Sequence, residues 1–223
     1  MRSRRLAADG YDVHAISRSA ADSEAATAAG VPATVCDVTR EDAVEQLIGR
    51  LGPLRVIVDA HGVYEHSLPA TDTDSDAFRR VLDINVTGAF IAARAAARTM
   101  QPGGVIGSVN GLAGEPGAAA YNASKAAVHS LTQTLAVELA DRGIRVVCVA
   151  PGWVRTAMTE FAIDDDVRSG RRRFNPQGRV AEPDEIAALV AWLCTSDAGF
   201  ITGSVITIDG GQMALLPPAW VVD

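Results

Sequence analysis

Tyr121 and Lys125 stand four residues apart near the start of an expected helix, and Ser108 lies thirteen residues upstream. Residues four apart lie on the same helix face, one turn from each other. A nearby ammonium group favours the tyrosinate form, so Lys125 can prepare Tyr121 for proton transfer. Ser108, at the end of an expected strand, can donate a hydrogen bond to a carbonyl oxygen. The three residue types could therefore protonate a carbonyl as hydride arrives, or run the reverse reaction.

A Tyr-x-x-x-Lys pattern by itself also fits a surface tyrosine beside a solvated lysine, so the elements around it matter. Short apolar runs rich in Val and Ile, typical of strands buried on both faces, alternate with amphipathic or Ala-rich stretches. The expected strands are 13–17, 33–38, 55–60, 105–109, 145–150 and 205–208; the expected helices are 19–29, 40–51, 76–100, 118–141 and 183–195, the second capped by Thr39. Alternating strands and helices predict an α/β fold: one Rossmann-type, doubly wound parallel sheet in a three-layer α/β/α domain over residues 1–223.

Further motifs fall in a fixed order along this pattern. They are Asp37-Val38, Asp59-Ala60-His61-Gly62, Asn85 within Leu82–Gly88, then Ser108, Tyr121 and Lys125, followed by Pro151–Thr156, Thr202-Gly203 and Asp209-Gly210-Gly211. In these residues the chain resembles the short-chain dehydrogenase/reductase family from about Leu6 to Gln212. Complete members of that family have the strand order 3-2-1-4-5-6-7, with ligands at the carboxyl ends of the strands.

The resemblance implies a role for each matching residue. Tyr121 would be the general acid/base, Ser108 would polarise the carbonyl, Lys125 would bind the nicotinamide ribose, and Asn85 would hold a relay water. The implied cofactor-binding residues are Ser17, Arg18, Asp37, Val38, Ala60, Gly62, Tyr121, Lys125, Pro151, Gly152, Val154 and Thr156. The implied substrate pocket contains His61, Tyr64, Glu115, Trp153 and Phe161, although a lone His61 fits packing better than catalysis.

Cofactor choice depends on the end of the expected strand 13–17. Relatives that prefer NAD place an acidic residue there for the ribose hydroxyls. Here the strand ends in Ile16-Ser17-Arg18-Ser19, with no carboxylate. Arg18 can pair with a 2′-phosphate, so NADP(H) is expected in preference to NAD(H). Alternatively, Arg18 only flanks the adenine ring.

The chain departs from the family pattern at two places. The family opens with a strand and a Thr-Gly-x-x-x-Gly-x-Gly turn whose backbone N–H groups receive the pyrophosphate. Here the sequence starts within the helix that should follow, so that a central strand and the glycine loop are missing and two strand edges are left open. Either the sequence is incomplete or it belongs to a variant that no longer uses the cofactor, and retention of the downstream cofactor residues favours the first. The second departure is Asp59-Ala60-His61-Gly62, where relatives usually read Asn-Asn-Ala-Gly.

Composition limits the partners. The net charge of −7 argues against nucleic acid as a ligand. No apolar stretch approaches a membrane span, no metal site is expected, and three cysteines in apolar runs predict a reduced, cytoplasmic protein. A substrate lid is expected over 157–179 and a C-terminal tail over 213–223. By resemblance, a homo-oligomer (tetramer or dimer) is expected.

Three functions fit these features. The first is NADP(H)-dependent interconversion of a ketone and a secondary alcohol, acting on a small-molecule carbonyl or alcohol. The second is a non-redox lyase, dehydratase or cyclase that uses Ser108 and Tyr121 without a nucleotide, and the absent glycine loop favours it. The third is a catalytically silent scaffold, against which the complete set of Ser108, Asn85, Tyr121 and Lys125 argues.

Overall fold

The computed structural model describes residues 2–65, 68–102, 104–109, 117–156, 159 and 175–214. Six strands lie within these ranges: β1 (Ala15–Ser17), β2 (Ala33–Val35), β3 (Val56–Asp59), β4 (Val105–Val109), β5 (Arg145–Pro151) and β6 (Val205–Ile208). All six predicted strands are therefore present, β4 and β6 with the predicted bounds. Every pairing between them is parallel, as expected for strands joined by helices.

The strands form two sheets instead of the one that we predicted. One sheet has the order β1-β2 and the other has the order β3-β4-β5-β6. Both orders agree with the family order for the strands present. Across the described ranges, β1 pairs only with β2 and β3 only with β4, so that each has one edge without a strand. These are the two edges that the sequence predicted to be open, and this gap divides the sheet.

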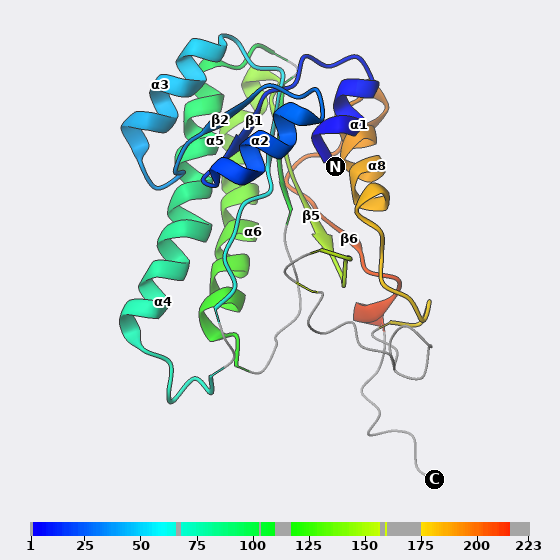
Figure 1. Cartoon of the computed structure of the whole chain (residues 1–223). Coiled ribbons are helices and arrows are strands. Elements are labelled where there is room, and N and C mark those ends of the chain that lie inside the picture. Colours follow the sequence, from blue (N-terminus) through cyan, green and yellow to red (C-terminus); the bar gives the residue numbers. More distant parts are fainter. Residues whose placement is uncertain are drawn as a thin grey trace.

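Helices cover both faces of the four-stranded sheet (Figure 1). The helices of the described ranges are α1 (Arg2–Ala8), α2 (Ala20–Ala28), α3 (Glu41–Leu51), α4 (Ser75–Leu82), α5 (Gly88–Thr99), α6 (Ala119–Leu139) and α8 (Pro183–Leu193), of which α2 packs against β1 and β2. Neighbouring β5 residues point to opposite faces, as the period of a strand requires. Val146 packs in a cluster with residues of α5 and α6, whereas Val147 and Val149 pack with residues of α8. The Rossmann-type α/β fold is thus confirmed.

Two predictions about helices are wrong. The expected single helix over 76–100 is divided into α4 and α5 by a π-helical turn, η1 (Asp83–Thr87). Thr39 does not cap α3, whose N-cap position is Arg40 with no side-chain cap bond. Instead, the Thr39 hydroxyl donates to Asp37 Oδ1 at 2.8 Å, because a short hydroxyl side chain readily bonds a neighbouring turn.

Other expectations concern cysteines and membranes. Cys36, Cys148 and Cys194 are all free thiols, and the first two are buried. None of the helices in the described ranges is both long enough and apolar enough to cross a membrane.

Candidate active site

The predicted site residues gather where the parallel strands end. Ser17 closes β1, Asp59 closes β3 and Pro151 closes β5. In register, Asp59 pairs with Ser108 of β4, and Ser108 pairs with Cys148 of β5. The backbone of Ser108 therefore lies at the edge where ligands bind in doubly wound sheets, although its side chain is outside the described part of the molecule.

Tyr121 and Lys125 lie together in the first turns of α6. The ammonium Nζ of Lys125 is 4.9 Å from the centre of the Tyr121 ring, and the Lys125 side chain is buried. Tyr64, from the segment after β3, meets the same ring edge-on, with centroids 5.2 Å apart. The Lys125 ammonium group and Tyr64 therefore both contact the Tyr121 ring.

Asn85 is held in the π-helical turn η1 by three hydrogen bonds. Its Oδ1 accepts from Val63 N at 2.8 Å, and its Nδ2 donates to Val63 O and Ser124 Oγ at 3.0 Å each. Asn85 is only 3% exposed. π-Turns often occur at functional sites, because the extra residue reorients a side chain within a helix. The turn directs Asn85 toward α6, where Ser124 precedes Lys125.

Glycines allow close approach in this region. A Cβ at Gly62 would lie 3.4 Å from both Asn85 Oδ1 and Lys125 Nζ. A Cβ at Gly152 would lie 2.9 Å from the Asp209 Cα, which is too close without a shift in the backbone. Gly62 therefore leaves room between the Asn85 amide and the Lys125 ammonium group, and Gly152 lets the ends of β5 and β6 approach.

The two ring nitrogens of His61 contact other protein atoms. Its Nδ1 contacts Asp59 Oδ1, and its Nε2 is 2.7 Å from the backbone oxygen of Ile84. Both ring nitrogens are thus occupied by protein atoms, and the placement of His61 among substrate-binding residues remains only a prediction.

A second group of predicted residues surrounds the ends of β1 and β2. Ser17 Oγ accepts from Ser19 N and donates to Asp22 Oδ2, while Arg18 is exposed. The Thr39 backbone N–H and then its hydroxyl donate to Asp37 and hold the pKa of that carboxyl below its usual value, with a smaller contribution from the positive charge of Arg18. Arg18 and the ionised Asp37 therefore influence each other across the two-stranded sheet.

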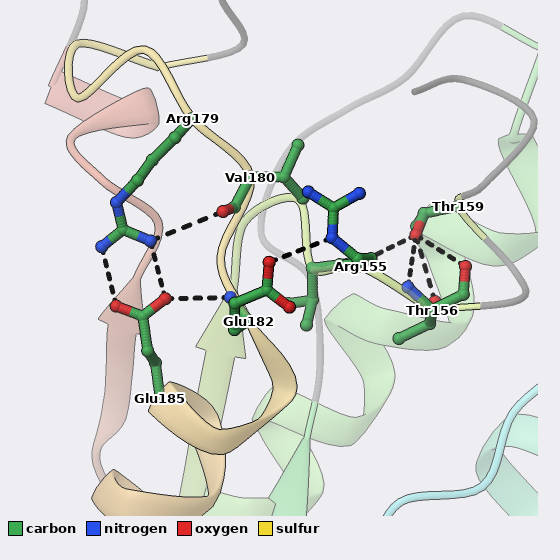
Figure 2. A network of polar contacts seen from close by, with 8 residues as sticks. Arg155, Thr156, Thr159, Arg179, Val180, Glu182 and Glu185 are labelled. Carbon is green, nitrogen blue, oxygen red and sulfur yellow. Dashed lines mark hydrogen bonds and ion pairs between the residues drawn. The ribbon is translucent and has the colours of Figure 1, made fainter. Parts of the chain in front are cut away.

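The segment after β5 forms an ordered turn. Val154 is buried and forms an isolated parallel bridge with Ala181. Thr156 N donates to Thr159 Oγ1 at 3.0 Å, and the same hydroxyl donates to Val154 O (Figure 2). Because the Val154 side chain packs in the core, this residue offers a ligand its backbone alone.

Comparison with known proteins identifies the family to which these elements belong. A family model described as enoyl-(acyl carrier protein) reductase matches residues 2–213.

The chain belongs to the short-chain dehydrogenase/reductase family.

Two relatives and one solved structure illustrate the similarity. The uncharacterized short-chain type dehydrogenase/reductase y4vI of Sinorhizobium fredii is 43% identical over 82% of this chain, and the chain spans only 35% of that relative's length. The 3-oxoacyl-[acyl-carrier-protein] reductase MabA of Mycobacterium tuberculosis is 36% identical over 93% of this chain and 85% of the relative. The crystal structure of BdcA in complex with NADPH superposes with a TM-score of 0.85 at 29% identity, covering 99% of this chain and 92% of the other.

Two features of this short-chain dehydrogenase/reductase were missed from the sequence. Thr159 links Val154 to Thr156, but it carried no signal beyond lying three residues after a predicted cofactor residue. A pair of ion pairs borders the same region: Arg155 Nε donates to Glu182 Oε1 at 3.0 Å, and Arg179 binds Glu185 through both guanidinium nitrogens (Figure 2). The hydrogen bonds from Arg179 lower the pKa of Glu185 to about 2.

Some predictions fall outside the described residues. Glu115 and Phe161 are among them, as are most of the predicted lid 157–179 and all of the tail beyond Ala214. Residues 175–179 of the predicted lid are described. The last of them, Arg179, forms an ion pair with Glu185 of α8. Trp153 is half-buried beside the Val154 bridge, and its backbone oxygen accepts from Ala181 N.

Proposed function

We propose that this chain is a nicotinamide-dependent oxidoreductase that interconverts a ketone and a secondary alcohol, with Tyr121 as general acid/base. The observation that carries the proposal is the buried Lys125 ammonium group 4.9 Å from the Tyr121 ring centre. A cation so close to the ring stabilises the tyrosinate form, because opposite charges favour the ionised state. Tyr121 can then give its proton to a carbonyl oxygen, or remove one from an alcohol.

The neighbouring residues supply the other functions of the reaction. Ser108, at the end of β4, is assigned to hydrogen-bond the substrate oxygen and so orient the carbonyl. Lys125 is assigned to pass a proton to Tyr121. The Asn85 amide faces the same small space beside Gly62 as the Lys125 ammonium group. Asn85, Ser124 and Lys125 are buried, so bulk water has little access to this side of Tyr121.

The residues present fit the two ends of a nicotinamide dinucleotide. At one end are Lys125, Tyr121 and the Val154–Thr156 turn; at the other are Arg18 and Asp37 beside the β1-β2 edge. When bound, the nicotinamide supplies or accepts the hydride. The part of the chain that the structure describes contains no glycine-rich phosphate loop, and the gap between β1 and β3 lies between the two ends.

We assign NADP(H) as the preferred cofactor because β1 ends at Ser17 and is followed by Arg18, without a carboxylate to bind a ribose 2′-hydroxyl. The solved relative BdcA, which holds NADPH, supports this assignment. A small-molecule ketone or alcohol is the proposed substrate, and the name of the mycobacterial relative supports a ketone within an acyl chain. We also propose a homo-oligomer, tetramer or dimer, and, from the three free cysteines, a cytoplasmic location.

Calorimetry with NADPH and NADH tests the cofactor assignment. NADPH is expected to bind the wild-type chain more tightly than NADH. Arg18→Ala should remove most of this difference, whereas Lys125→Met should weaken both cofactors equally. Tighter binding of NADH by the wild-type chain would refute the NADP(H) assignment.

The alternative is a non-redox enzyme on the same scaffold, favoured by the lack of a glycine loop in the described residues. The two functions differ in one readout. Oxidation of NADPH that depends on an added ketone, and that is lost in Tyr121→Phe, supports the oxidoreductase. Tyr121-dependent turnover of a substrate with no change in NADPH supports the alternative.

A further inference from the structure

His61 is placed between two hydrogen-bond acceptors. Its Nδ1 contacts the Asp59 carboxylate, and its Nε2 lies 2.7 Å from Ile84 O. A neutral imidazole has one N–H and can donate to only one of them. With a neutral ring and an ionised Asp59, one of the two contacts has no proton in it. Both contacts are hydrogen bonds only if the His61–Asp59 pair holds one additional proton. The geometry therefore indicates a charged imidazolium paired with Asp59.

The atom that Nε2 reaches belongs to the turn that carries Asn85. Ile84 lies in the π-helical turn η1, directly before Asn85 in the sequence. The segment after β3 contacts this turn twice, since His61 binds Ile84 O and Val63 binds both ends of the Asn85 amide. The two contacts act on neighbouring residues, so His61 helps to fix the orientation of Asn85.

Space around the ring is provided by Gly88, the first residue of α5. A Cβ at Gly88 would lie 3.0 Å from His61 Nε2 and 2.7 Å from a methyl group of Val38. The ring thus occupies a site that only glycine leaves open. The charged groups that act on His61 are Asp59 from β3 and Lys125 from α6, and η1 contributes the Ile84 carbonyl.

We propose that His61, ion-paired with Asp59, is a positioning residue that holds the Asn85 turn in its active form, and that loss of the ring's second proton at alkaline pH releases Ile84. The proposal rests on the function proposed above only for its kinetic consequence. The protonated ring donates to both partners, so it fixes Asn85 against α6. The neutral ring keeps one of these bonds, and the turn is then free to shift.

Electrostatics agree with the geometry. Burial opposes a charge on His61, but the hydrogen bond and negative charge of Asp59, together with the Ile84 carbonyl, outweigh it and raise the pKa of His61 above its usual value of 6.5. The positive charge of Lys125 acts in the opposite direction. A group whose pKa is raised on folding contributes stability below its unfolded value, and this is lost as pH rises through the folded value. Release of Ile84 therefore follows an increase in pH.

The first test measures protonation without any need for activity. Nitrogen-15 NMR of the purified chain should show both His61 ring nitrogens protonated at neutral pH, with His61→Gln identifying the signals. The side-chain amide of Asn85 and the backbone amide of Val63 should shift with the same titration in the wild type. Neither should shift in His61→Gln. A singly protonated His61 ring at neutral pH would overturn the proposal, whether or not the chain reduces ketones.

The second test is the pH dependence of kcat. Glutamine can donate to Ile84 O but does not titrate, so His61→Gln should stay within about threefold of the wild-type kcat at neutral pH. Its kcat should decline less at alkaline pH than that of the wild type, because the contribution of His61 is removed and only that of Tyr121 remains. His61→Ala should lower kcat by roughly tenfold or more with little change in KM for the ketone, because misplacement of catalytic groups acts on the chemical step. His14→Gln is the matched control: this ring bonds Thr34 between β1 and β2, and its loss should leave the profile unchanged. A wild-type profile in His61→Ala would refute the positioning role.

Discussion

Replacing Asn85 with alanine removes three hydrogen bonds at a buried position, two with Val63 and one with Ser124 Oγ. A hydrogen bond contributes about 1 kcal/mol net, and a buried partner left unpaired costs about 1–3 kcal/mol. Val63 is partly exposed, so water can replace some of its lost contacts. We therefore expect Asn85→Ala to lower the free energy of unfolding by about 3 kcal/mol.

Urea unfolding followed by circular dichroism measures this loss. For a chain of this size each kcal/mol lowers Tm by roughly 2–4 °C, so the variant should melt about 6–12 °C below the wild type. Ser124→Ala removes one of the same three bonds, together with the hydroxyl's donation to Tyr121 O at 2.6 Å. The two substitutions share a contact, so the double variant should be less destabilised than the sum of the single ones by about 1 kcal/mol.

Two results would refute this reasoning. A loss below about 1 kcal/mol in Asn85→Ala would mean that water replaces the three bonds at no cost. Strict additivity of Asn85→Ala and Ser124→Ala would mean that the amide and the hydroxyl do not interact in solution. Either result would remove the basis for a fixed Asn85 beside Lys125.

Three further outcomes are expected. Thr159→Val removes the hydroxyl that joins Val154 O to Thr156 N, so it should raise the Kd for NADPH several-fold in calorimetry while changing Tm little; an unchanged Kd would argue against a cofactor role for this turn. Arg18→Glu places a carboxylate at the end of β1 and should make NADH the tighter-binding cofactor; retained preference for NADPH would contradict the assignment. Because hydrogen bonds from Thr39 lower the pKa of Asp37, the wild type should lose stability as pH falls from the ordinary value of 3.8 through the lower folded value, and Thr39→Val should reduce this loss in melts at acid and neutral pH.

Much of the fold could be predicted from apolar patterns, because strands buried on both faces leave nearly continuous runs of Val and Ile. The ends of β4 and β6 follow directly from such runs. The two open strand edges could also be predicted, because the described residues before Ala15 have no strand-like apolar run and form no strand. Thr39 was misassigned because a hydroxyl before a helix can bond either the helix or the preceding turn, and the choice depends on the position of Asp37.

The site was harder to predict where tertiary contacts decide the outcome. Tyr121 and Lys125 could be paired from spacing, because both lie on one helix. The π-helical turn at Asn85 could not be predicted, since it shifts the backbone by one residue without a distinctive composition. The role of His61 depends on Ile84 and Gly88, which lie more than twenty residues further along the chain. Only the folded arrangement brings two acceptors to the same ring.

Transfer of deuterium to a ketone from NADPH that carries deuterium at both C4 positions of the nicotinamide tests the proposed hydride transfer directly. The product alcohol is expected to carry deuterium on the former carbonyl carbon, as detected by mass spectrometry. The rate in Tyr121→Phe should be lower by about a hundredfold or more, as expected when a general acid is removed. Turnover of a carbonyl substrate by the folded chain without deuterium in the product, or an undiminished rate in Tyr121→Phe, would contradict hydride transfer with Tyr121 as general acid/base.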